Sequence, residues 1–171
     1  TGHDPVSHPE RRRAKGSVEA PDDLGGDVDH AALIVPFARL KAHEAAGLQV
    51  GGTMQGGHLR IEGAETGLAG LRESRLTLSH TEIRDCSFTL SVANGGTFDH
   101  LQAIGGASVR ITGGLLSLTD SLVDLQSPVN GPDCLVFSRG GATLEHTRVT
   151  GCHCPMHINQ ADQPIRVTNS I

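Results

Sequence analysis

A short motif recurs along the chain at intervals of 20 to 26 residues. Most copies read apolar residue, any residue, then His, Asp or Asn, then Ser or Thr, any residue and a second apolar residue. The copies begin at Leu78, Phe98, Leu118, Leu144 and Val167, so the intervals are 20, 20, 26 and 23 residues. Repetition with this period indicates a solenoid, in which each repeat forms one coil and stacks on its neighbours.

The residues between the motifs have the pattern of short strands joined by glycine turns. Gly-Gly pairs occur at 51–52, 56–57, 95–96, 105–106, 113–114 and 140–141. Apolar and polar residues alternate between them, as in Leu76-Thr77-Leu78 and Ile165-Arg166-Val167. Alternation with a period of two predicts strands with one buried face, and the glycines predict turns.

The third residue of the motif is predicted to lie at a corner of each coil. Side chains two residues apart in a strand point the same way, so the chain must turn between the two apolar positions. Asn, Asp and His are the non-glycine residues that best tolerate the left-handed backbone of such a turn. We therefore predict a corner ladder with one member about every 4.8 Å, made of His80, His100, Asp120, His146 and Asn169. Corner geometry alone accounts for this pattern, although stacked imidazoles beside a carboxylate could also bind a metal or titrate together near about pH 6.5.

The composition agrees with a narrow core. The 171 residues include 22 Gly and four Phe, but no Tyr and no Trp. We expect Leu, Ile, Val and Ala to fill the coils, with Phe88, Phe98 and Phe137 at inward strand positions. The net charge of −5 and the lack of Tyr and Trp argue against a nucleic-acid partner.

On these residues and spacings, the chain resembles the right-handed parallel β-helix repeat proteins of the pectate-lyase-like superfamily. The resemblance covers residues 58–171 and implies an all-β fold, a right-handed parallel β-helix solenoid with coils of about 20–26 residues. It also implies a short N-terminal capping helix, for which residues 36–46 fit because Pro36 suits a first turn and Gly47 a helix end. A pentapeptide-repeat helix is the alternative, but the 23- and 26-residue intervals break its five-residue step.

Three regions are expected along the chain. Residues 1–29 are polar and interrupted by prolines, which predicts a flexible leader. Residues 30–57 would hold the capping helix and the turn into the first coil, and residues 58–171 the coils themselves. The last motif stops at Ile171, partway round a coil, so we expect the coils to continue or to be completed by end-to-end self-association at an open C-terminal coil. No apolar stretch reaches about 18 residues, so no membrane span is expected.

The densest group of potential metal ligands lies near the end of the chain. Soft sulfur and imidazole ligands suit Cu or Zn, and the candidates are Cys152, His153, Cys154, Met156 and His157. In an extended segment, however, these side chains would be divided between two faces.

A disulfide is the leading interpretation of the same region. Cys134 opens a strand one coil earlier and so lies near both Cys152 and Cys154, either of which could be its partner. Cys86 is three coils from Cys152, about 14 Å by strand spacing, which is too far for a bond. Free thiols are a further alternative.

Three functions stay open. The first is a non-catalytic, extracytoplasmic scaffold or binding module of the bacterial envelope or surface, with a protein or polysaccharide partner and no cofactor. The second is a polysaccharide lyase or hydrolase, whose catalytic residues are unknown because the outward charged candidates are scattered over Arg84, Asp85, Asp99, Arg110, Asp124, Asp133 and Arg139. The third is a periplasmic copper-binding protein that uses residues 152–157. Architecture and cysteine positions favour a secreted, periplasmic or cell-surface location.

Overall fold

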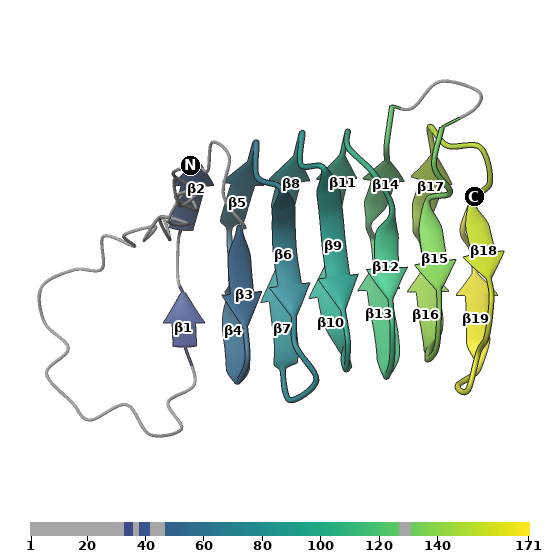
Figure 1. The fold of residues 1–171 in the computed structure, drawn as a ribbon, viewed down its shortest axis with the longest axis horizontal. Coiled ribbons are helices and arrows are strands. Elements are labelled where there is room, and N and C mark those ends of the chain that lie inside the picture. Colours follow the sequence, from purple (N-terminus) through teal and green to yellow (C-terminus); the bar gives the residue numbers. More distant parts are fainter. Residues whose placement is uncertain (1–32, 36–37, 42–46, 127–130) are drawn as a thin grey trace, which may run out of the picture.

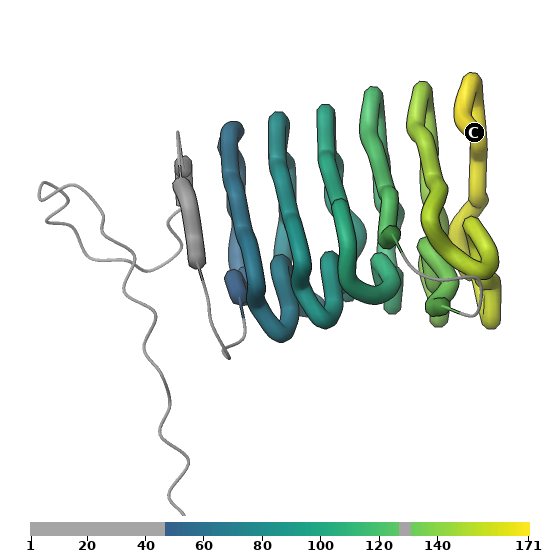
Figure 2. Tube along the Cα trace, turned by 90° about the horizontal axis from the view of Figure 1, so that it is seen from above, coloured from purple at the N-terminus to yellow at the C-terminus, as the bar shows by residue number. Residues whose placement is uncertain are grey.

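The chain winds into a solenoid with three parallel sheets (Figure 1). The structure is a computed structural model that describes residues 33–35, 38–41, 47–126 and 131–171. Each full coil contributes one strand to each sheet, and the coils stack along the long axis. Figure 2 shows these coils side by side, in chain order from one end to the other. The fold class expected from the repeat, a parallel β-helix solenoid, is confirmed.

The strands of each sheet follow one another at intervals of one coil. The first sheet contains β1 (Leu33–Val35), β4 (Thr53–Gly57), β7 (Arg75–Ser79), β10 (Gly95–Asp99), β13 (Leu115–Thr119), β16 (Gly141–Glu145) and β19 (Ile165–Thr168). The second contains β2 (Ala38–Lys41), β5 (Leu59–Glu62), β8 (Glu82–Arg84), β11 (Gln102–Ile104), β14 (Leu122–Asp124) and β17 (Arg148–Thr150). The third contains β3 (Leu48–Val50), β6 (Thr66–Gly70), β9 (Phe88–Val92), β12 (Val109–Ile111), β15 (Leu135–Phe137) and β18 (Met156–Ile158).

The strand register follows the spacing of the sequence motif. Phe98 pairs with Leu78 on one side and with Leu118 on the other, and Leu144 pairs with Leu118 and Val167. The unequal intervals therefore match one coil each, and the five-residue step of a pentapeptide helix is not kept. Extra residues in the longer coils are accommodated outside the paired strands.

The N-terminal cap differs from the expectation. The predicted helix at residues 36–46 is wrong for residues 38–41, which form β2 and pair in parallel with β5. The rest of that range, like the predicted leader at residues 1–29, lies outside the described residues. Strands β1, β3 and β4 also join the sheets before residue 58. A ten-residue helix is marginal by itself, whereas pairing satisfies the backbone groups along the edge of the first coil.

The interior is a stack of aliphatic layers. Alternate residues point inward in strands such as β5, β7 and β12, and Phe98 and Phe137 are fully buried among Leu, Ile and Val, as predicted. The prediction that Phe88 points inward is wrong. Its side chain is only half-buried, and the Arg110 guanidinium lies 4.3 Å from the centre of its ring. The cation–π contact explains how an aromatic ring is accommodated on the outer surface of a coil.

The corner between the first and second sheets has the predicted left-handed backbone. All five predicted corner residues have φ between +48° and +56°, and His58, which sequence reasoning missed, is a sixth member at +58°. The backbone N–H of each member from His58 to His146 donates to a carbonyl of the next coil at 2.8–3.1 Å. The corner is therefore both a turn and a part of the hydrogen-bonded stack.

Small hydroxyl residues line the inner side of this corner. The Ser121 hydroxyl donates to Thr119 and accepts from the backbone N–H of Leu101. The Thr147 hydroxyl lies 3.1 and 3.2 Å from the carbonyl oxygens of Glu145 and Leu118. Thr81 occupies the same position two coils earlier than Ser121, but its buried hydroxyl has no hydrogen-bond partner. A buried hydroxyl without a partner costs free energy.

Replacing the two threonines by valine is predicted to have opposite effects. Thr81→Val keeps the shape and removes an unsatisfied group, so the free energy of unfolding should rise by about 1 kcal/mol. Thr147→Val removes a bonded hydroxyl and should lower it by about 1 kcal/mol. Urea denaturation of both variants and the parent checks the prediction, and a change of the same sign in both would contradict it.

Candidate functional site

The corner ladder forms a polar edge along the solenoid. It consists of His58, His80, His100, Asp120, His146 and Asn169, each directly after a strand of the first sheet. Because the coils are in register, each member lies next to its counterpart one coil away. The sequence signal for His58 was weak, since its copy of the motif begins with Gly56 instead of an apolar residue.

The first three members are stacked imidazoles. The ring centres of His58 and His80 are 4.9 Å apart with an interplanar angle of 25°. Those of His80 and His100 are 4.7 Å apart and nearly parallel, at 7°. These distances match the spacing between neighbouring strands, so the stack follows from the register.

Carboxylates enter the ladder beyond the stack. Asp99 Oδ1 lies 3.0 Å from His100 Nδ1, and Asp120 Oδ1 lies 3.5 Å from His146 Nδ1. The amide nitrogen of Asn169 is 3.3 Å from His146 Nε2. The Asp and His side chains of these two pairs are about half exposed, with relative exposures between 46% and 52%. Beyond the stacked imidazoles, carboxylate and imidazole groups thus lie side by side at the surface.

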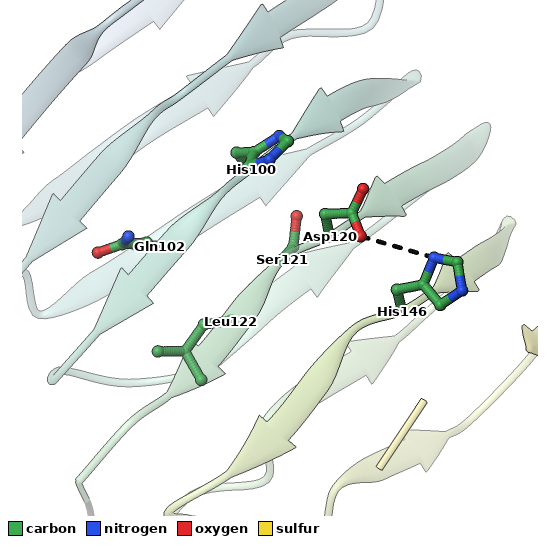
Figure 3. Close-up of a pocket in the computed structure, with 6 residues that line it drawn as sticks. All are labelled: His100, Gln102, Asp120, Ser121, Leu122 and His146. Carbon is green, nitrogen blue, oxygen red and sulfur yellow. Dashed lines mark ion pairs between the residues drawn. The ribbon is translucent and has the colours of Figure 1, made fainter. Parts of the chain in front are cut away.

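An open depression lies against this part of the ladder. It has a volume of about 340 Å³ and is lined by His100, Gln102, Asp120, Ser121, Leu122 and His146 (Figure 3). Figure 3 shows the Asp120–His146 pair on one side of the depression. Sequence reasoning identified the ladder members but missed Gln102 and Leu122. Both lie two residues after a corner residue and point outward from the second sheet, which is the signal that would have found them.

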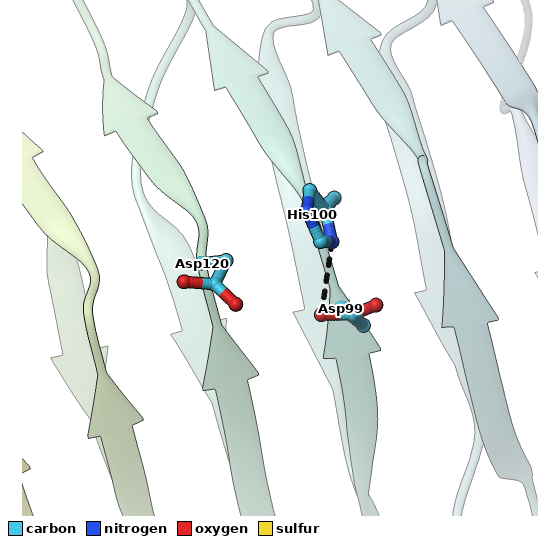
Figure 4. Close-up of side chains that lie close together, drawn as sticks. All are labelled: Asp99, His100 and Asp120. Carbon is cyan, nitrogen blue, oxygen red and sulfur yellow. Dashed lines mark ion pairs between the residues drawn. The ribbon is translucent and has the colours of Figure 1, made fainter.

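Two neighbouring coils bring together a set of potential metal ligands. One ligand atom each from Asp99, His100 and Asp120 lies within 4.8 Å of the other two (Figure 4). Asp99 ends β10, His100 follows it at the corner, and Asp120 is the corner residue of the next coil. Within the described ranges, this is the one set of three or more His, Cys, Asp or Glu side chains whose ligand atoms lie this close together.

The cysteine region contains a disulfide. Cys134 and Cys152 are bonded, with Cα atoms 5.6 Å apart, so the first of the two predicted pairings forms and the second does not. Cys86 and Cys154 are free thiols. Cys86 and Cys152 each directly follow a residue with positive φ at the end of a second-sheet strand, Asp85 and Gly151, as expected for positions three coils apart.

The soft-ligand set predicted at residues 152–157 does not converge on one point. Cys152 is consumed by the disulfide, and the Cys154 thiol donates to the carbonyl of Met156 at 3.1 Å. The two ring nitrogens of His157 are 2.8 Å from Asp133 and 3.0 Å from Asn159. His153 is exposed on the adjacent turn. A thiolate and imidazole set for Cu or Zn is therefore not assembled here.

Several of the outward charged residues considered for catalysis have a partner, either a neighbouring charged or histidine side chain or the backbone. On the second sheet, Arg60 and Arg84 both bind Glu82, and Arg60 also lies 3.5 Å from Glu62. Arg60 and Glu82 face each other across β5 and β8, whereas the other two pairs each lie on one strand. Opposite charges therefore offset along this face of the sheet. Asp124 accepts a hydrogen bond from the backbone of Gln126. Neither arrangement has the form of an acidic groove beside an unpaired arginine.

The geometry defines a disulfide-bonded parallel β-solenoid with an exposed histidine and aspartate ladder. Comparisons with protein-family models, with curated proteins and with solved structures found no match. Relationship to the pectate-lyase-like proteins is therefore a likeness of architecture. In the part of the chain that the structure describes, no helix has the length and apolar character to cross a membrane.

We predict that reducing the disulfide weakens the solenoid. Cys134 and Cys152 are 18 residues apart, and closing a loop of that size contributes about 3 kcal/mol to the free energy of unfolding. Denaturation with and without a reductant measures the loss, and Cys154→Ser serves as a control that keeps the bond. Alkylation of the unfolded, unreduced chain should label the two free cysteines, Cys86 and Cys154. Labelling of Cys152 would contradict the pairing.

The two free thiols are predicted to react at different rates in the folded protein. Burial raises the pKa of the Cys86 thiol, whereas Cys154 is partly exposed. The thiolate is the reactive form, so a raised pKa leaves less of it at neutral pH. Timed alkylation followed by peptide mass spectrometry should find Cys154 modified first. Faster modification of Cys86 would contradict the prediction and show that its thiol is accessible to the reagent.

Proposed function

We propose that the protein is a non-catalytic scaffold or binding module that works outside the cytoplasm, on the bacterial envelope or surface. The observation that carries the proposal is a row of short hydroxyl side chains along the outer face of the first sheet. Thr77, Thr97, Ser117 and Thr143 are partners in register on four successive coils. A repeated, evenly spaced row on a rigid sheet is a surface suited to an extended partner.

The chemistry of this hydroxyl row favours a polysaccharide partner. Each hydroxyl can both donate and accept a hydrogen bond, as can each hydroxyl of a sugar. Thr77 and Thr97 are exposed, and Ser117 and Thr143 are half-buried. Because the backbone beneath is paired on both sides, binding would require little ordering of the protein.

The disulfide supports the location. Disulfides persist in oxidising compartments and are rare in the cytosol, and Cys134–Cys152 joins two successive coils of the solenoid. A periplasmic, secreted or surface-exposed setting is consistent with such a bond. The alternatives of a polysaccharide lyase or hydrolase and of a copper-binding protein have less support, because their expected residues are paired off or dispersed.

Co-sedimentation with insoluble polysaccharides, together with retardation in gels containing soluble neutral or acidic ones, tests the proposal. We expect binding to at least one polysaccharide without release of reducing or unsaturated sugars. Thr97→Arg should abolish binding, since it places a long charged side chain in the middle of the hydroxyl row. Ser91→Arg, at an outward position of the third sheet, is the matched control and should bind normally.

Two results would overturn this proposal. Release of sugar products would identify an enzyme, and equal binding by the parent and Thr97→Arg would exclude the hydroxyl row as the binding surface. Circular dichroism of both arginine variants verifies that the sheets are intact. If no polysaccharide binds, the polysaccharide partner is excluded and the scaffold would have to bind a protein.

A further inference from the structure

We propose that Asp99, His100 and Asp120 form a binding site for a divalent transition-metal ion, with Zn²⁺ as the probe of choice. The proposal does not depend on the scaffold function, and the site is distinct from the cysteine-rich segment. One imidazole nitrogen and two carboxylate oxygens make up a ligand set that zinc accepts. The remaining coordination positions would be filled by water.

The distances between the ligand atoms are close to those of a loaded site. Zinc bonds of about 2.0–2.2 Å place two ligands of one ion roughly 3–3.5 Å apart. Asp99 Oδ1 and His100 Nδ1 are already 3.0 Å apart, and the ligand atoms of all three residues lie within 4.8 Å. Binding of an ion would draw the exposed Asp120 carboxylate closer to the other two ligand atoms.

The backbone holds the three residues in place. The N–H groups of His100 and Asp120 donate at 3.0 Å to the carbonyls of Thr119 and Glu145, each on the following coil. Both residues have the left-handed conformation, with φ of +56° and +48°. Register and corner geometry thus place the Cβ atoms of the ligands before any ion binds, which lowers the ordering cost of binding.

Neighbouring ladder members orient the ligands. The His80 ring stacks on His100 at 4.7 Å and so restricts its rotation. His146 lies 3.5 Å from Asp120 and in turn contacts Asn169. Such outer partners fix the orientation of metal ligands and tune affinity.

Space and charge also suit a cation. The open depression lined by His100, Asp120 and His146 adjoins the site, so water or a ligand group can reach an ion from that side. Two carboxylates on adjacent coils repel each other when both are ionised, and a bound dication would remove that repulsion.

Isothermal titration of the full, metal-free chain with Zn²⁺ tests the site. His100→Asn and Asp120→Asn each remove a ligand, and asparagine is tolerated in the left-handed conformation of the corner. Loss of an outer-sphere partner alone typically costs 10–100-fold in metal affinity, so loss of a direct ligand should weaken binding at least about tenfold. His58→Asn, at the other end of the ladder, is the matched control and should retain parental affinity.

Magnetic resonance of the histidine rings distinguishes this site from other histidines of the chain. Addition of Zn²⁺ should shift the His100 ring signals first, while those of His157 stay unchanged. Unchanged affinity in both His100→Asn and Asp120→Asn, or no zinc binding by the parent, would overturn the proposal. Loss of binding in His157→Asn with retention in His100→Asn would instead assign the ion to the cysteine-rich segment.

Discussion

Backbone hydrogen bonds between successive coils hold the corner of the solenoid, and every other feature of the molecule depends on that register. A corner residue with positive φ turns the chain while its N–H donates to the next coil, as at His80 and His146. Each strand of the second sheet therefore begins in the same register as its neighbours. Aliphatic side chains then meet aliphatic side chains inside, and outward side chains form straight rows.

The same register brings polar and titratable side chains together on an open surface of the solenoid. Side chains that are 20 or more residues apart in sequence become neighbours at the spacing of adjacent strands. Three histidines stack in this way, and the carboxylates of Asp99 and Asp120 meet around His100. Function on such a surface depends on which residue occupies a given position in consecutive coils. A longer coil does not disturb this order, because Leu118 and Leu144 pair in register across the 26-residue interval.

Much of the fold was predictable because its determinants are local. The motif marks one corner per coil, and the left-handed preference of His, Asp and Asn is a property of the residue itself. Prediction failed where a local signal was ambiguous or weak. Pro36 and Gly47 suited the two ends of a helix, but residues 38–41 between them pair as a strand with β5. Phe88 was assigned to the core from its apolar character, yet Arg110 provides a partner for it outside. His58 was missed because glycine replaces the apolar start of its motif.

The sequence by itself determined the coil period, the corner ladder and the set of cysteines close enough to pair, because each follows from spacing and backbone preference. Tertiary structure decided which contacts form within those limits. Cys152 and Cys154 differ by two residues and both lie near Cys134, so only the path of the turn after Gly151 selects Cys152. Side-chain direction across two coils brings together Asp99, His100 and Asp120. It also places the His157 ring beside Asp133 and not beside the cysteines. Side-chain direction is set by packing in three dimensions, which spacing along the chain does not specify.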